Sequence, residues 1–312
     1  MIEQPNELSL PVFVNQTLHA NLDAIRCEIS GVLDNADIEY IHRIRIAVRR
    51  LRNNLIIFSH FSYPALCKIL SDLHQQTDFF AILLAQARDL DMQQVLIDSL
   101  LQNTLPQSAA RLQAIVSEDR QRIQKELEAQ LSSGIFSRQL DEYQNTLQII
   151  NTSADDTSRF VEDMPNRAMV STAAQTIAGL SRMHAHIDPV SRHQFRKTVR
   201  RLRYTMECFQ SSIAFDLQES ITYIHLIQDM LGDIHDLDIL IQIVEEHRDA
   251  IRADYPAILP IIQNAQLPYL GDFIQACESG GFMQLLLSIL QKFNPTTYNP
   301  DGNINHDHSA HW

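Results

Sequence analysis

The feature that most constrains this chain is an internal repeat of a strongly basic segment. The stretch HRIRIAVRRLRNNLIIF at residues 42–58 recurs 151 residues later as HQFRKTVRRLRYTMECF at 193–209, with eight identities in seventeen ungapped positions. A second matching pair, LLAQARDLDM at 83–92 and MLGDIHDLDI at 230–239, follows at an offset of 147 residues. Two matched pairs in the same order indicate a tandem duplication, so the chain should contain one structural unit built twice.

Most of the chain has the apolar periodicity of helices. Apolar residues recur at steps of three and four, and 8 Gly and 11 Pro are too few for the dense turns of an all-β protein. Asp188 followed by Pro189 is a typical helix start, with a capping side chain before a proline at the first helical position. The expected fold is therefore all-α. The expected helices span residues 8–33, 38–60, 64–102, 107–131, 137–150, 167–186, 189–213, 216–248, 256–278 and 281–293.

The duplication also suggests how the chain is divided. The polar segment 151–166 lacks periodicity and is predicted to link a first half, about 8–150, to a second half, about 167–294. Residues 295–312 are predicted to form a disordered tail, so that one domain covers 8–294. No run of eighteen apolar residues, secretory signal or CxxC pair occurs. We therefore expect a cytoplasmic protein that does not enter a membrane.

The basic residues are concentrated in the two repeated segments. The chain has a formal net charge of −13, with 25 Lys and Arg against 38 Asp and Glu. Residues 42–52 and 193–203 hold 10 of those basic residues and no acidic one, which leaves 15 basic against 38 acidic side chains elsewhere. An average charge of this sign normally disfavours a polyanionic partner, but here an acidic body surrounds two cationic stripes.

Each basic segment places its cations on one side of a helix. At about 100° per residue, the histidine and three of the arginines in each copy share an arc beside the apolar face. Four aligned cations repel one another unless an anion relieves them, and the planar fork of arginine suits phosphate oxygens. The predicted binding residues are His42, Arg45, Arg49, Arg52, His193, Arg196, Arg200 and Arg203, with Arg50, Lys197, Arg201 and Arg88 as secondary candidates. The sequence predicts no catalytic residue, metal site or cofactor.

At these residues the sequence resembles the CHAD family, the conserved-histidine α-helical domains. The family pattern of a His, an Arg three residues later and then xxRRLR matches 42–52 and 193–203, and its RDLD and LGxxxD elements match 88–91 and 231–236. The resemblance covers about residues 8–294. It implies two pseudo-symmetric four-helix bundles whose basic helices face a central cleft that binds inorganic polyphosphate, and association with polyphosphate granules. The triphosphatase domain of the CYTH type, to which some members are fused, is not expected here, since no alternating ExExK strand occurs.

Three other functions stay open from the sequence. A metal-dependent phosphatase would use segments such as HAHID at 184–188, but no Gly-rich phosphate loop, HExxH or GxSxG accompanies them, and we expect no enzyme. A nucleic-acid binder would need the same arginines plus aromatic residues for stacking, and the one aromatic inside the stripes, Phe195, lies on the apolar side. The third is a structural adaptor with a vestigial cleft. Inorganic polyphosphate is the predicted partner, and nucleic acid is disfavoured.

Overall fold

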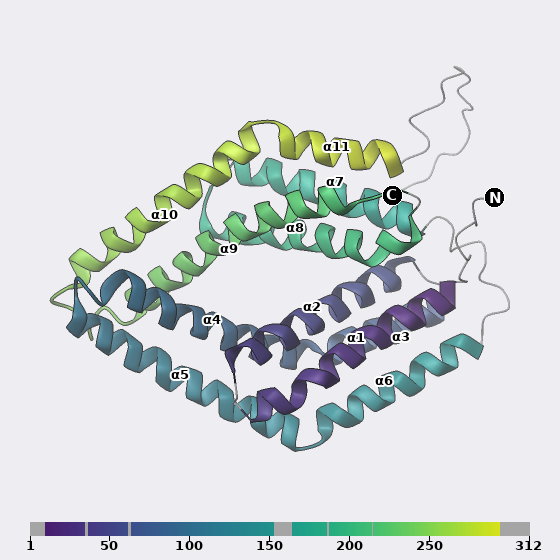
Figure 1. Ribbon diagram of the computed structural model, residues 1–312, viewed down its shortest axis with the longest axis horizontal. Coiled ribbons are helices and arrows are strands. Elements are labelled where there is room, and N and C mark those ends of the chain that lie inside the picture. Colours follow the sequence, from purple (N-terminus) through teal and green to yellow (C-terminus); the bar gives the residue numbers. More distant parts are fainter. Residues whose placement is uncertain are drawn as a thin grey trace.

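The computed structural model describes residues 10–34, 37–61, 64–152, 164–185, 187–213 and 215–293, and in this part of the chain every regular element is a helix (Figure 1). The predicted all-α fold is confirmed. The first half contains α1 (Leu10–Leu33), α2 (Ile38–Phe61), α3 (Pro64–Gln76), α4 (Asp78–Leu101), α5 (Pro106–Ser132) and α6 (Ile135–Thr152). The second half contains α7 (Met164–Ala185), α8 (Pro189–Phe209), the short 3-10 helix η2 (Gln210–Ser212), α9 (Gln218–Glu246), α10 (Tyr255–Glu278) and α11 (Gly281–Phe293).

The linker between the halves is shorter than predicted at both of its ends. Helix α6 continues to Thr152 and α7 already begins at Met164. The rest of the predicted linker, residues 153–163, and the predicted tail at 295–312 lie outside the described residues. The predicted start of α8 is found: Asp188 caps the helix by accepting a hydrogen bond of 2.9 Å from the backbone N–H of Ser191.

The single helix predicted for 64–102 is wrong, because the chain breaks at Thr77 into α3 and α4. The break is held by a side chain from another helix. The Arg52 guanidinium donates to the carbonyl of His74 at 3.1 Å and to the hydroxyl of Thr77 at 2.8 Å, and it pairs with Asp78. At this break the carbonyl of His74 also accepts from the backbone N–H and the hydroxyl of Thr77, so Arg52 adds to a local hydrogen-bond network. The apolar periodicity of the sequence continues across the break and does not reveal these contacts.

The hydrophobic core does not divide into one core per half. The largest cluster of buried apolar side chains draws on both halves, and Phe13, Phe58 and Phe209 pack together across them with ring centroids 5.7–6.4 Å apart. A second cluster joins the C-terminal ends of α4 and α9 to the N-terminal ends of α5 and α10, at the left end of the view in Figure 1. Both clusters therefore fix the two halves to each other.

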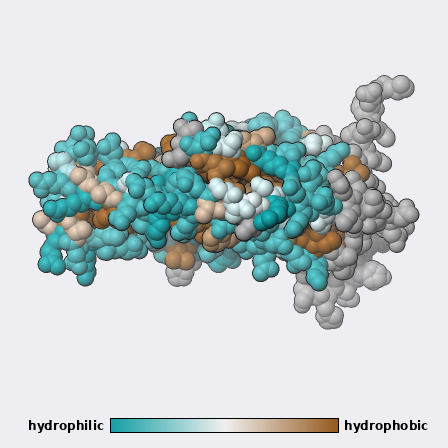
Figure 2. Space-filling view, turned by 90° about the horizontal axis from the view of Figure 1, so that it is seen from below, coloured by the Kyte–Doolittle hydropathy of each residue, from teal (hydrophilic) through white to brown (hydrophobic). Residues whose placement is uncertain are grey.

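Figure 2 shows one face that is mostly hydrophilic, with hydrophobic residues gathered near its middle. Among the described helices none is by itself long and apolar enough to cross a membrane; α10 and α11, which meet at a bend of 47°, meet that criterion only when taken together.

Candidate functional site

Helices α2 and α8 carry the two predicted basic stripes, and their apolar faces determine where each stripe points. The predicted apolar faces of both helices are buried in the large core. Their buried residues are Ile41, Ile44, Val48, Leu51 and Leu55 in α2, and Phe195, Val199, Leu202 and Met206 in α8. Because α2 also packs directly against α8, the stripes of the two halves face each other.

Four arginines meet where α2 and α8 pack together, and we call them the arginine cluster. They are Arg45 and Arg49 from α2 and Arg196 and Arg200 from α8. Burial lowers the pKa of all four, and arginines of the opposite helix lower it further. The pKa of Arg49 falls to about 10, which still leaves its guanidinium protonated at pH 7. The cluster is therefore a group of half-buried cations held close together.

Several buried side-chain nitrogens in the stripes make no hydrogen bond within the described part of the chain. They are Nε of Arg45, Arg49, Arg196 and Arg203, and Nδ1 of His42 and His193. Most buried polar groups in folded proteins have a partner, so each exception requires a reason. His42 matches His193 in the repeat, and Arg45 matches Arg196. These two pairs of matched atoms are unpaired in both copies, so the pattern is not a packing fault of one half.

The DLD segments supply the carboxylates nearest to the cluster. The first aspartate of each segment faces the arginines. Asp89 Oδ1 lies 3.3 Å from Arg45 Nη2. Burial raises the pKa of Asp236 to about 6, and the charge of Arg196 opposes that rise. The second aspartate of each segment forms a buried ion pair elsewhere, Asp91 with Arg120 and Asp238 with Arg192. Among the described residues, only these two carboxylates thus oppose the four arginines, and the positive charge remains in excess.

A histidine flanks the cluster in each half, and each has a different neighbour. Burial and then Arg88 lower the pKa of His42, whereas burial and then Lys197 lower the pKa of His193. The ring of His193 also lies 4.9 Å from that of His235. Burial and then Arg196 lower the pKa of His235 to about 3, so this imidazole is neutral at pH 7.

His235 lies beside the cluster and was not among the binding residues predicted from the sequence. It occupies the position in α9 that Arg88 occupies in α4, at the offset of 147 residues between the DLD segments. The alignment of the two DLD segments could have identified His235, because Arg88 was already a secondary candidate.

The other predicted residues lie around the cluster or away from it. Arg203 is buried beside it, where its charge lowers the pKa of Arg49, and it also pairs with Glu207 at 3.3 Å. Arg52 is used at the break between α3 and α4 and does not join the cluster. The secondary candidates are likewise divided: Lys197 and Arg88 face the histidines, Arg50 pairs with Glu207 at 3.1 Å, and Arg201 donates to Gln175 at 3.2 Å.

Removal of the Arg52 side chain is expected to affect stability rather than binding. Arg52→Ala deletes the hydrogen bonds to His74 and Thr77 and the pair with Asp78, and should lower the free energy of unfolding by about 1–3 kcal/mol. Denaturant unfolding measures the change in the free energy of unfolding, and a polyphosphate titration of the folded variant measures any change in affinity. A loss of affinity at unchanged stability would instead support the sequence prediction that Arg52 binds the ligand.

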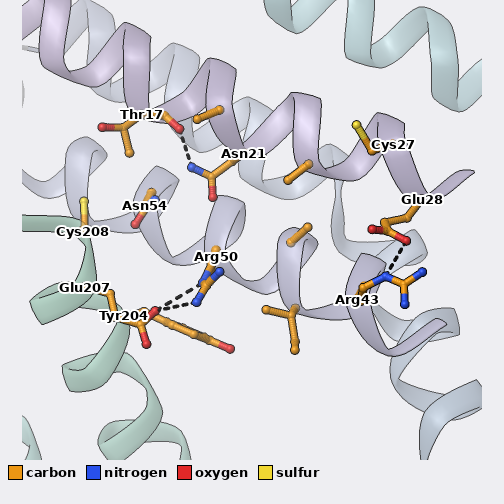
Figure 3. Close-up of a pocket in the computed structure, with 14 residues that line it drawn as sticks. Thr17, Asn21, Cys27, Glu28, Arg43, Arg50, Asn54, Tyr204, Glu207 and Cys208 are labelled. Atoms are coloured by element: carbon orange, nitrogen blue, oxygen red, sulfur yellow. Dashed lines mark hydrogen bonds and ion pairs between the residues drawn. The ribbon is translucent and has the colours of Figure 1, made fainter. Parts of the chain in front are cut away.

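A cavity of about 780 Å³ lies on another face of α2, between α1 and α8 (Figure 3). Its arginines project roughly opposite to Arg45 and Arg49, at about 100° per residue around α2. Both are paired: Arg43 Nε donates to Glu28 at 2.9 Å, and Arg50 reaches Glu207 at 3.1 Å. The charges of this cavity are therefore balanced locally, which distinguishes it from the arginine cluster.

In the part of the chain that the structure describes, no three His, Cys, Asp or Glu side chains are grouped closely enough to hold a metal ion.

Comparison with known families gives the same assignment as the repeated motif. The family model described as CHAD domain matches residues 16–245, which is most of the chain. The chain belongs to the CHAD family. The match includes both basic helices and both DLD segments of this CHAD domain, and so the whole arginine cluster.

Solved structures show the same fold. This CHAD domain is similar to the crystal structure of the CHAD domain from the plant Ricinus communis, with 22% identity, a TM-score of 0.63, and coverage of 92% of this chain and 94% of that one. It also resembles PptA from Streptomyces chartreusis, with 14% identity, a TM-score of 0.51, and coverage of 92% and 99%. At these identities the likeness shows a shared fold. A search of curated proteins found no significant match.

Proposed function

We propose that this protein binds inorganic polyphosphate through the arginine cluster and the flanking histidines. CHAD domains in general bind polyphosphate. The observation that carries the proposal for this chain is the meeting of four arginines from two helices, with Nε atoms unpaired at matched positions. A phosphate chain supplies the acceptors that these donors lack and relieves the repulsion between the guanidiniums.

A narrow, densely charged chain suits this cluster better than a nucleic acid. The arginines are half-buried between two helices, and the rest of the protein is acidic, so a bulky duplex would be repelled. Single-stranded nucleic acids usually gain affinity by stacking on exposed aromatic rings. The aromatic residue beside the arginine cluster is Tyr204, and it is only 2% exposed. A structural adaptor would not require unpaired cations at matched positions.

In this proposal the protein is a binding protein and not an enzyme. Binding requires only the arginines and histidines, without a cofactor. Its place would be the cytoplasm, on polyphosphate granules, where the ligand is concentrated enough for a single cluster to hold the protein on the granule surface.

A direct titration tests the proposed ligand. Long-chain polyphosphate should bind at least about tenfold more tightly than single-stranded DNA of equal total charge, and affinity should fall linearly with the logarithm of salt concentration as condensed counterions are released. Isothermal calorimetry at several salt concentrations measures both effects. Equal affinity for the two polymers would favour a general polyanion binder, and an affinity that does not change with salt would remove the electrostatic basis of the proposal.

A further inference from the structure

A buried tyrosine next to the arginine cluster has a hydroxyl without a partner. Tyr204 follows the last arginine of the motif in α8 and is 2% exposed, and its Oη makes no hydrogen bond with any described residue. The matching position in α2 is Asn53, which is 7% exposed and whose Nδ2 is equally unpaired. Both halves therefore hold an uncharged side chain with an unsatisfied donor at this position. Such a group costs stability unless something at the site binds it.

The phenol of Tyr204 is placed centrally among the cations. Tyr204 is an electrostatic neighbour of all four arginines of the cluster, two from each helix. The guanidinium of Arg203 lies 4.8 Å from the centre of its ring. Tyr204 also lines the neighbouring cavity, beside the pair formed by Arg50 and Glu207 (Figure 3). The ring thus lies between the balanced charges of the cavity and the excess positive charge of the cluster.

The chemistry around this hydroxyl favours an anionic acceptor. Guanidinium groups donate hydrogen bonds and cannot accept them, so the arginines cannot take the hydroxyl proton of Tyr204. The cluster attracts phosphate oxygens to the same place, and each such oxygen is a strong acceptor. A neutral hydroxyl adds a donor there without adding to the repulsion among the cations.

We propose that Tyr204 is a ligand-binding residue whose hydroxyl donates a hydrogen bond to a phosphate oxygen held by the arginine cluster. This inference rests on the proposed binding of polyphosphate. It differs from the contribution of the arginines, because a hydrogen bond from a neutral group involves no release of counterions. The affinity supplied by Tyr204 should therefore be the same at every salt concentration.

The test is Tyr204→Phe, with Tyr143→Phe as the matched control. Tyr143 in α6 is 3% exposed and its Oη is also buried without a hydrogen bond, but it is not among the groups that influence the cluster. Tyr204→Phe should weaken polyphosphate binding by about tenfold or more, the loss of one hydrogen bond to a charged acceptor, while the slope of affinity against salt stays that of the wild type. Tyr143→Phe should bind as the wild type does. Neither variant should unfold at a lower temperature, since each loses a buried hydroxyl that had no partner.

Each outcome decides the inference. Wild-type affinity in Tyr204→Phe would overturn it while leaving the proposed function intact, because the unmodified protein would still bind polyphosphate. A loss of affinity that follows a drop in unfolding temperature would show a structural role and overturn it as well. If the wild type itself does not bind polyphosphate, the inference and the proposed function fail together. A tyrosine absorbance difference on binding, kept in Tyr143→Phe and absent in Tyr204→Phe, would support direct contact.

Discussion

Reversing the charge of one pair of cluster arginines should weaken polyphosphate binding by at least about a hundredfold, since two charge-assisted hydrogen-bonding groups are lost and two repulsive ones replace them. Arg45→Glu with Arg49→Glu removes the contribution of α2, and Arg196→Glu with Arg200→Glu removes that of α8. Because the four side chains form one cluster, the two double variants should lose similar affinity. Calorimetric titration of both variants with long-chain polyphosphate measures the effect.

The matched control changes the total charge by the same amount at a distance from the cluster. Arg122→Glu with Arg252→Glu alters two side chains that are 64% and 82% exposed, and should lower the affinity only slightly, because solvent and salt screen exposed charges. The Arg196→Glu with Arg200→Glu variant should unfold at no lower temperature than the wild type, since it relieves repulsion among the clustered cations, whereas Arg45→Glu also breaks the pair with Asp89. A double cluster variant with unchanged affinity would show that one half binds alone, and a loss of helical signal would show that its arginines are structural.

Polyphosphate binding should tighten as the pH falls from about 8 to 6. In the free protein, burial and neighbouring cations hold the pKa values of His42, His193 and His235 below the usual value, so these imidazoles are neutral at pH 7. A bound phosphate favours the imidazolium and raises these pKa values. At a pH between the pKa of a histidine in the free protein and its pKa in the complex, the complex carries more protons than the free protein. Each proton taken up on binding gives at most about a tenfold gain in affinity for each unit by which the pH falls.

Glutamine variants separate the histidines from the other titrating groups. His42→Gln, His193→Gln and His235→Gln combined keep hydrogen-bonding groups but lose the protons, so the affinity should become nearly constant between pH 7 and 8. Asp236 should still take up a proton at lower pH, because burial raises its pKa to about 6 and a nearby phosphate raises it further. Imidazole NMR titrations with and without polyphosphate assign the effect. Histidine signals that do not shift on saturation would show that only the arginines bind.

The sequence by itself determined the helices, their apolar faces and the paired stripes. These are local properties: a step of three or four residues fixes which side chains share a face, and a duplicated segment repeats that face in the second half. The start of α8 at Pro189 follows from its own residues and was predicted for that reason. The same reasoning identified Arg45, Arg49, Arg196 and Arg200 as cations directed away from the apolar face, and the structure brings these four together.

Only the tertiary structure decided which cations are available to a ligand. Arg52 and Arg49 look alike in the sequence, but Arg52 is bound at the junction of α3 and α4, while Arg49 has no hydrogen-bonding partner among the described residues. His235 and Tyr204 join the site because α8 packs between α2 and α9, and helix periodicity carries no information on such contacts. The physical reason is that a side chain's direction is set by its own helix, whereas its partners are set by the helices packed against it.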